Sequence, residues 1–400
     1  MKFDETLKRR EGESAEAYLV RIASQRERQN LTWQDVTDIC NDQLGLDHAE
    51  STYRKKYTAF ERLFAATGGG STGEMLEQLR EERRELYKAR TLLRDERNEY
   101  NRILREQARQ NDARDAMIKA IAEHAPVLRA PRPPEGGTVG QTGAMAVMVS
   151  DMHYGMSQDN AAGAFSPEMA WGMISQYAAQ ILGIQERHKA RECHVLLGGD
   201  IVSGIIHTAL RVEASRNVIE QVMGASNAIA WMVNVLSRKF AQVHVHGVTG
   251  NHGRVTPRIS DGIAGENFDA LIPYYLKKAL GQNERVTVHE PVNPTLDVFD
   301  MAGRHCALVH GNNDRIETIG MDIAPMAGMT DYIFYGHVHN AGMYPARHGG
   351  KVIVNGSFVG VDTYAFENRY FVRPEQVVLV LGDDGVDSLC RCTLTGGEKK

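Results

Sequence analysis

The chain has 400 residues, of which 42% are apolar and 24% are charged. A globular composition of this length suits two or three domains and excludes a collagen-like, a purely coiled-coil or a largely disordered protein. The 46 Lys and Arg residues against 51 Asp and Glu residues give a net charge of -5. This total neither indicates nor excludes a nucleic acid partner, because a local basic patch would leave it unchanged.

The five cysteines form no CxxC pair, which favours a reducing compartment, and we therefore expect a cytoplasmic protein. In residues 1–18, charges flank the place where the apolar core of a signal peptide would lie, so we expect no export. The sequence has no apolar run of about 18 residues, which predicts that no segment inserts into a membrane.

Residues 1–70 are predicted to form a small helical domain. Thr32 is a suitable cap for a helix that opens at Trp33, and a second helix with basic and aromatic residues opens at Ser51. This order is typical of a helix-turn-helix whose second helix meets DNA. A small bundle with a solvated basic face accounts for the same residues, so both interpretations stay open.

Residues 74–124 are predicted to form a long charged helix, because they contain neither glycine nor proline and follow a glycine-rich break at 68–73. Leu79, Leu86, Leu93 and Tyr100 follow heptad spacing, but the position four residues later is mostly arginine. A helix that lies on another domain and a homo-oligomeric coiled coil are equally compatible with this pattern. The interleaved glutamates favour a solvated face over a phosphate-binding one.

Residues 125–143 are rich in proline and glycine and are predicted to be a linker to a last domain at 144–400. We expect strands at 144–149, 194–197, 242–248, 286–290, 296–300, 306–310, 332–336, 351–356, 376–381 and 388–394, and helices at 166–188, 208–240 and 266–281. This alternation predicts an α/β layered domain whose central sheet carries antiparallel additions.

Polar residues follow five of these strands at the point where each strand ends. They are Asp151 with His153, Asp200, Asn251 with His252, His310, and His337 with His339. Because ligands bind outside the carboxyl ends of strands in α/β sheets, we expect these side chains to converge on one site. Imidazole mixed with carboxylate and amide oxygen suits borderline divalent metals, and this many ligands indicates two ions that share a carboxylate.

The motifs D-x-H, G-D, G-N-H, a single His before Gly, and G-H-x-H, in this order over about 144–360, resemble those of the calcineurin-like metallophosphoesterase superfamily. The resemblance implies a two-sheet sandwich flanked by helices, and two divalent ions, with Mn²⁺ favoured over Fe²⁺, Zn²⁺ or Ni²⁺. It implies that Asp151, His153 and His339 hold the first metal, that Asp200 bridges, and that Asn251, His310 and His337 hold the second. It makes His252 the catalytic histidine rather than a ligand.

One position departs from this family, because Gly253 and Arg254 follow His252 where an acidic residue is usual. The Arg254 guanidinium suits a phosphate or a nucleic acid backbone, and a solvent-facing loop explains it equally well. His207, beyond Asp200, is a second candidate substrate contact. His244 and His246 face one side of a strand and, without a cluster of their own, are predicted to be structural.

The predicted function is hydrolysis of phosphodiester bonds by a two-metal phosphodiesterase, and a DNA nuclease is the favoured hypothesis. DNA is favoured because of the N-terminal domain, the arginine-rich helix and the Arg254 loop, and the chain also looks similar to phosphoesterases of bacterial viruses. One alternative is a phosphatase or cyclic-nucleotide phosphodiesterase that acts on small or protein substrates. The other is a non-enzymatic DNA-binding scaffold, which the full set of ligands disfavours.

Overall fold

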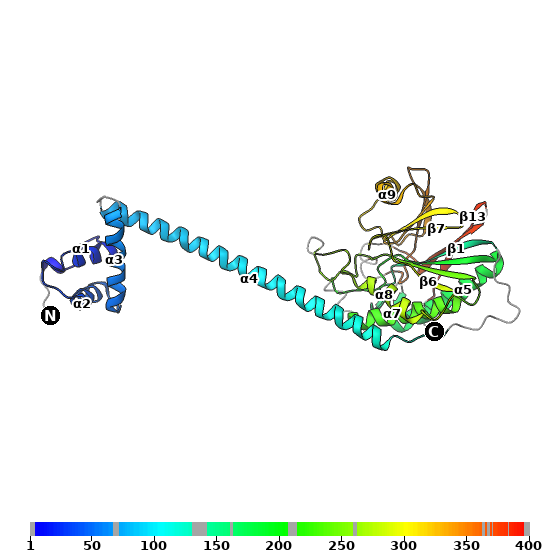
Figure 1. Cartoon of the computed structure of the whole chain (residues 1–400), viewed down its shortest axis with the longest axis horizontal. Helices are drawn as coiled ribbons and strands as arrows, with labels where there is room; N and C mark the ends of the chain where they lie inside the picture. The colour runs from blue at the N-terminus through cyan, green and yellow to red at the C-terminus, as the bar shows by residue number, and fades with distance from the viewer. Residues whose placement is uncertain are drawn as a thin grey trace. The chain divides into compact units, whose positions relative to one another are not determined.

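The computed structural model describes residues 5–66, 72–129, 142–160, 163–206, 214–258, 262–361, 365, 369, 371–382 and 384–395. The chain divides into two compact units, Met1–Ala108 and Arg109–Lys400 (Figure 1). Each unit has an apolar core of its own.

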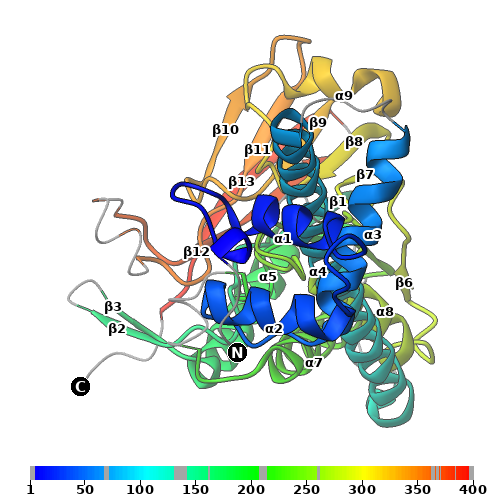
Figure 2. The ribbon, with the colours of Figure 1, turned by 90° about the vertical axis from the view of Figure 1, so that its left-hand side faces the viewer.

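The N-terminal unit packs helices α1 (Ala15–Ser24), α2 (Trp33–Leu44) and α3 (Glu50–Ala66), after a short 3₁₀ helix η1 (Glu5–Leu7) (Figure 2). Thr32 caps α2 as expected, in a capping box with Asp35. Gly45 ends α2 in the left-handed conformation, which a residue without Cβ adopts at low cost. The Asn41 side chain then bonds both backbone groups of His48, so the turn into α3 is fixed. The helices share a core that contains Tyr18, Ile22, Val36, Ile39 and Tyr53.

Helix α4 (Thr72–His124) is continuous over 53 residues. Within the first unit it exposes the heptad residues Leu86, Leu93 and Tyr100. Its last turns belong to the second unit, where Met117 and Ile121 are buried in the main apolar core. The end of the predicted 74–124 helix is therefore part of the fold that follows, whereas most of the predicted linker, 130–141, lies outside the described residues.

The second unit is a sandwich of two sheets. The six-stranded sheet has the order β13 (Gly385–Thr393), β12 (Glu375–Gly382), β1 (Thr142–Val149), β4 (Ala190–Leu197), β5 (Gln242–Gly247) and β6 (Val286–Val288). The five-stranded sheet has the order β10 (Gly342–Pro345), β11 (Lys351–Val354), β9 (Tyr332–Tyr335), β8 (Arg304–Val309) and β7 (Leu296–Met301). Strands β1, β4, β5 and β6 are parallel, as are β8, β9 and β11. The expected mixture of parallel strands and antiparallel additions is confirmed.

Helices cover the outer face of both sheets (Figure 1). Helices α5 (Pro167–His188), α7 (Val218–Leu236) and α8 (Leu271–Ala279) pack on the six-stranded sheet, and α9 (Ile319–Ala327) packs on the other. In β4, Val195 and Leu197 face the helices, whereas Leu196 faces the second sheet. Because the strands are buried on both faces, they appear in the sequence as continuous apolar runs. The fold is the two-sheet sandwich flanked by helices that the resemblance implied.

Two helix boundaries differ from the prediction. Of the helix expected over 208–240, residues 208–213 lie outside the described residues. The described part is α7, which begins at Val218 because Asn217 caps it in a capping box with Glu220, and which ends at Leu236. The segment expected as one helix over 266–281 is a 3₁₀ turn, η3 (Phe268–Ala270), followed by α8. The short antiparallel pair β2 (Gln158–Asn160) and β3 (Gly163–Phe165) was not expected. Within the described ranges, no helix combines the length and apolarity needed to cross a bilayer.

Candidate metal centre

The predicted ligands lie where parallel strands of the two sheets end. Asp151 and His153 follow β1, Asp200 follows β4, Asn251 follows β5, His310 follows β8, and His337 with His339 follow β9. Because β1, β4 and β5 are parallel neighbours, their carboxyl ends share one edge of the sheet. A chain of backbone bonds joins the first two loops there, from Asp151 N to Gly199 O and from His153 N to Asp200 O.

Three overlapping groups at this edge offer metal-ligand atoms within 4.8 Å of one another. They are Asp151, His153 and His339; His153, Asp200 and His252; and Asp200, His310 and His337. Asn251 lies beside the third group, because its Oδ1 is 3.1 Å from His310 Nε2. The first and third groups hold the residues that the resemblance implied for two metals. The individual ligand roles stay predictions.

Backbone strain is concentrated in these residues. Asp151, His153, Asp200, His337 and His339 have φ values of 53°, 41°, 51°, 60° and 60°, in the left-handed region that non-glycine residues rarely adopt. Such conformations cost of order 1–3 kcal/mol each and cluster at functional sites. Gly250 is also required, because a Cβ there would collide with the Asp200 carboxylate. The rest of the fold therefore holds these residues in strained backbone conformations that place their side chains at the site.

The two buried aspartates are held by neighbouring groups. The Asp151 carboxylate accepts bonds from Ser150 Oγ and His337 N and lies 3.1 Å from His339 Nε2. Asp200 Oδ1 accepts a 2.7 Å bond from His252 N, and its Oδ2 lies 3.1 Å from His310 Nε2. These contacts fix both carboxylates before any ligand is bound.

The pKa shifts follow from burial and from these pairings. Burial opposes ionisation of Asp151, but His339 holds the pKa of this carboxyl below its usual value. Burial opposes ionisation of Asp200 too, but His310 and His252 hold its pKa well below the usual value. Burial and the nearby His252 lower the pKa of His153 to about 3. Burial and His310 lower the pKa of His337. Ionised carboxylates and neutral imidazoles are the forms that bind metals.

Asp269 is a central residue that the sequence analysis missed. Its buried carboxylate accepts backbone bonds from Asp200 N, Ile201 N, Val202 N and Gly250 N, at 2.9 to 3.3 Å. It therefore ties the loop after β4 to the loop after β5. Burial and the Asp200 charge raise the pKa of Asp269 to about 6, against the effect of these N–H donors. Since Asp269 lies in a different segment without a local motif, no sequence pattern pointed to it.

We expect Asp269→Ala to lower the free energy of unfolding by at least about 3 kcal/mol, because buried N–H donors left without an acceptor cost ~1–3 kcal/mol each. Urea unfolding in the presence of a chelator measures this without a contribution from bound metal. The exposed Asp322→Ala is the control, with an expected change within ~0.5 kcal/mol. A loss in the Asp269 variant as small as in the control would show that the two loops hold their positions independently.

A second buried network supports the loop after β1. Asn355, which follows β11, donates to Ser150 Oγ at 2.9 Å and to Gln376 Oε1 at 2.8 Å. Gln376 Oε1 also accepts a 3.0 Å bond from Ser150 N. Ser150 in turn donates to Asp151. The loop that begins at Asn355 thus supports the site through a side chain.

The residues predicted to act on the substrate are placed as follows. The His252 ring lies 4.5 Å from the His153 ring, centroid to centroid, and its Nδ1 is 3.4 Å from Ser203 O. Arg254 is half-buried, and its buried Nε has no hydrogen-bond partner. His207 lies outside the described residues. The roles of His252, Arg254 and His207 stay predictions.

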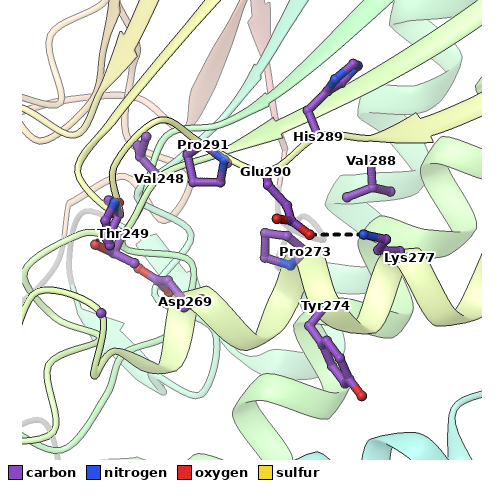
Figure 3. A pocket seen from close by; sticks show the side chains of 14 residues that line it. Val248, Thr249, Asp269, Pro273, Tyr274, Lys277, Val288, His289, Glu290 and Pro291 are labelled. Atoms are coloured by element: carbon purple, nitrogen blue, oxygen red, sulfur yellow. Dashed lines mark hydrogen bonds and ion pairs between the residues drawn. The ribbon is translucent and has the colours of Figure 1, made fainter. Parts of the chain in front are cut away.

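A cavity of about 400 Å³ adjoins this centre (Figure 3). Its lining includes Asp269 and Thr249, which follows β5 and belongs to the same edge of the sheet. Lys277 and Glu290 form a 3.1 Å ion pair within the lining. The cavity was not predicted from the sequence, because residues from β5, α8 and the segment after β6 form it only in the folded chain.

The donor set fits divalent metal ions. His153 Nδ1 is buried and has no hydrogen-bond partner, which is costly unless a ligand occupies it. Bound divalent ions would polarise the phosphoryl oxygens of an ester and lower the pKa of a water molecule. The chain itself positions the ligands, keeps the aspartates ionised and leaves His337 exposed at the open side.

Comparisons with known proteins agree with this geometry. Residues 145–366 match the Calcineurin-like phosphoesterase superfamily domain, and residues 4–67 match the YonJ N-terminal domain. The SPbeta prophage-derived uncharacterized protein YonJ of Bacillus subtilis (strain 168) is 22% identical over 372 residues, which is 90% of this chain and 91% of that protein.

Solved structures that align with the chain include an archaeal phosphodiesterase and a dimetal phosphatase from Danio rerio. The first is 13% identical, with a TM-score of 0.32, and covers 62% of this chain and 99% of its own. The second is 11% identical, with a TM-score of 0.31, and covers 64% and 100%.

The superfamily match spans more than half of the chain and contains the strand-end loops that carry the predicted ligands. The chain therefore belongs to the calcineurin-like phosphoesterase superfamily. It is a metal-dependent phosphoesterase, and the non-enzymatic alternative is set aside.

Proposed function

We propose that the protein is a two-metal phosphodiesterase that hydrolyses DNA, with Mn²⁺ as the favoured ion. The observation that carries the hydrolytic part is the convergence of carboxylates and imidazoles from five strand ends into overlapping groups that share Asp200 and His153. The side chain of Asp151 is fully buried, whereas that of His339 is 24% exposed. The site is therefore open on one side, as a polymeric substrate requires.

The N-terminal unit supports DNA as the substrate. The side chains of Arg54, Lys55 and Lys56 are exposed on α3, the helix that follows the turn after α2. A second helix with basic residues is the element that meets DNA in helix-turn-helix proteins. Arg254, with its unpartnered Nε beside the catalytic loop, suits a phosphate of the same substrate. The prophage-derived relative that spans both units is compatible with a virus-encoded nuclease.

We expect the combined variant Arg54→Glu, Lys55→Glu and Lys56→Glu to cleave DNA at least about tenfold more slowly at moderate salt, with unchanged hydrolysis of bis-p-nitrophenyl phosphate. Reversing phosphate contacts weakens binding to all DNA sequences and lowers the salt dependence by about one unit per lost contact. Full-length protein is assayed with Mn²⁺ on single-stranded, double-stranded and cyclic substrates.

The matched control reverses three exposed basic residues of the second unit, Arg187, Arg191 and Lys351. Equal DNA cleavage by both variants would remove the DNA-binding role of α3. Preference of the wild-type protein for p-nitrophenyl phosphate or cyclic nucleotides over DNA would instead support a phosphatase or a cyclic-nucleotide phosphodiesterase.

The exposed heptad residues support a homo-oligomer through α4. Leu86, Leu93 and Tyr100 are 71%, 66% and 63% exposed. Residues at heptad spacing form one stripe along a helix, and a second copy of the chain presents the same stripe. We propose that two copies pair along this stripe.

We expect Leu86→Glu with Leu93→Glu to convert the full-length dimer into a monomer, because four like charges would face one another in the paired helices. Light scattering after size-exclusion chromatography measures the mass. The control is Thr91→Glu with Asn98→Glu, which adds the same charge about 140° around α4 from this stripe. A wild-type protein that is monomeric at micromolar concentration contradicts the proposal.

A further inference from the structure

A second histidine cluster lies between the two sheets, away from the phosphoesterase centre. His194 on β4 and His244 on β5 are register partners, and their rings stack at 4.8 Å. His246 and His289 extend the cluster, and Asp297 on β7 of the other sheet closes it. Asp200 follows His194 by six residues, of which only Val195 to Leu197 continue β4, so these two residues lie at most about 20 Å apart. Among the described residues, the two sites share no ligand group. The sequence had indicated no cluster for His244 and His246, and the structure shows one, whereas their predicted structural role stays a prediction.

The hydrogen bonds in this cluster determine which ring nitrogens carry protons. Asp297 Oδ2 lies 2.9 Å from His246 Nδ1, and an ionised carboxylate only accepts, so His246 Nδ1 carries the proton. Burial lowers the pKa of His246, so the ring is neutral and its Nε2 is an acceptor. His194 Nδ1, 3.2 Å away, is then the donor to this atom.

The remaining nitrogen of His194 is therefore a bare acceptor. Burial and the neighbouring His246 lower the pKa of His194 to about 2, so its Nε2 carries no proton. This Nε2 is buried without a hydrogen-bond partner, and the residue is 4% exposed. A buried acceptor without a donor is costly, unless a cation binds to its lone pair.

Two further residues with metal-ligand atoms lie beside the His194 ring. Glu192 and His244 offer ligand atoms within 4.8 Å of each other and of the His194 ring. His289 Nε2 is 3.0 Å from His244 Nδ1 and so holds the His244 ring in place. The Glu192 side chain is 38% exposed, and its carboxylate is 4.0 Å from Arg191, a long distance for an ion pair. Such ligands bind zinc at ~2.0–2.2 Å, so the three side chains would close around a bound ion.

We propose that Glu192, His194 and His244 form a separate binding site for one transition-metal ion. Zn²⁺ is the ion that we expect there. Two imidazoles and one carboxylate suit Zn²⁺ and its neighbours rather than Mg²⁺ or Ca²⁺, which prefer oxygen ligands. The hydrogen bonds that link Asp297 to His246 and His246 to His194 resemble those that orient metal-binding histidines through the ring nitrogen that does not bind the metal. Because Asp297 belongs to the other sheet, an ion bound to His194 would stabilise the contact between the two sheets.

The test measures zinc in full-length protein that is stripped of metal, dialysed against Zn²⁺ and analysed by mass spectrometry. Glu192→Gln and His244→Gln are each expected to hold one ion fewer than the wild type and to keep their activity on bis-p-nitrophenyl phosphate. Glu186→Gln and His188→Gln, which make the same chemical changes at the end of α5, are expected to hold as many ions as the wild type. Equal zinc content in all these proteins overturns the proposal.

A second measurement separates this site from the phosphoesterase centre. In Asp200→Asn protein, added Zn²⁺ is still expected to raise the midpoint of thermal unfolding by several degrees, because an ion that binds only the folded state stabilises it. His244→Gln in the same background is expected to abolish that rise. A rise that persists in the double variant shows that the zinc binds elsewhere and contradicts the proposal, whatever the activity of the phosphoesterase centre.

Discussion

Asp200→Ala is expected to lose both divalent ions and to hydrolyse bis-p-nitrophenyl phosphate no faster than the buffer does. Asp200 belongs to two of the three ligand groups, and it shares one with His153 and the other with His310. Its carboxylate also fixes the His252 backbone. Removing this side chain takes a ligand from both metal positions. A change such as His339→Ala takes a ligand from one position only.

Metal content by mass spectrometry and turnover with Mn²⁺ measure this effect. Because Asp200→Ala also leaves the buried His310 without its anionic partner, circular dichroism must show that the variant is folded. Asp200→Asn keeps the size of the side chain and is the second variant, and the exposed Asp322→Asn is the matched control. Two ions retained by folded Asp200→Asn would defeat the assignment of Asp200 as the shared ligand.

His252→Ala is expected to retain its metal ions and to lose ~10² to 10⁴ in turnover, the usual range for removing a positioned acid or base. Its backbone bond to Asp200 Oδ1 holds the residue at the centre. The Ser203 carbonyl, 3.4 Å from Nδ1, favours the tautomer with a proton on that nitrogen. The other nitrogen, Nε2, is then the one that we expect to exchange a proton with the leaving group.

The size of the defect should depend on the leaving group. Nitrophenolate hardly needs a proton, so bis-p-nitrophenyl phosphate should reveal a smaller loss than a dinucleoside phosphodiester, whose departing alkoxide does need one. His305→Gln, at the opposite end of β8 from His310, is the control and is expected to change turnover less than about twofold.

Metal content decides between the two roles that the structure allows for His252, which lies in one ligand group with His153 and Asp200. Loss of an ion from His252→Ala would make this residue a ligand. Equal defects on both substrates would remove its role as the acid.

The sequence by itself determined the features that depend on short stretches of chain. An apolar run followed at once by D-x-H or G-N-H identifies both a strand and the residues at its end, because parallel strands deliver those ends to one edge. The start of α2 could be predicted for the same reason, because the cap Thr32 and its partner Asp35 are only three residues apart. The Asn217 cap of α7 is local in the same way, because its partner Glu220 is three residues away, and residues 214–217 before the helix are not helical although the prediction included them.

Only the tertiary structure decided the interactions between distant segments. Asp269 bonds Asp200 across 69 residues, and Asn355 bonds Ser150 across 205 residues. His194 meets His246 only because β4 and β5 pair in one register, and Asp297 reaches them from the second sheet. Such contacts carry no sequence pattern, because the positions of the strands in three dimensions, rather than their neighbours in the chain, determine which buried polar atoms are paired.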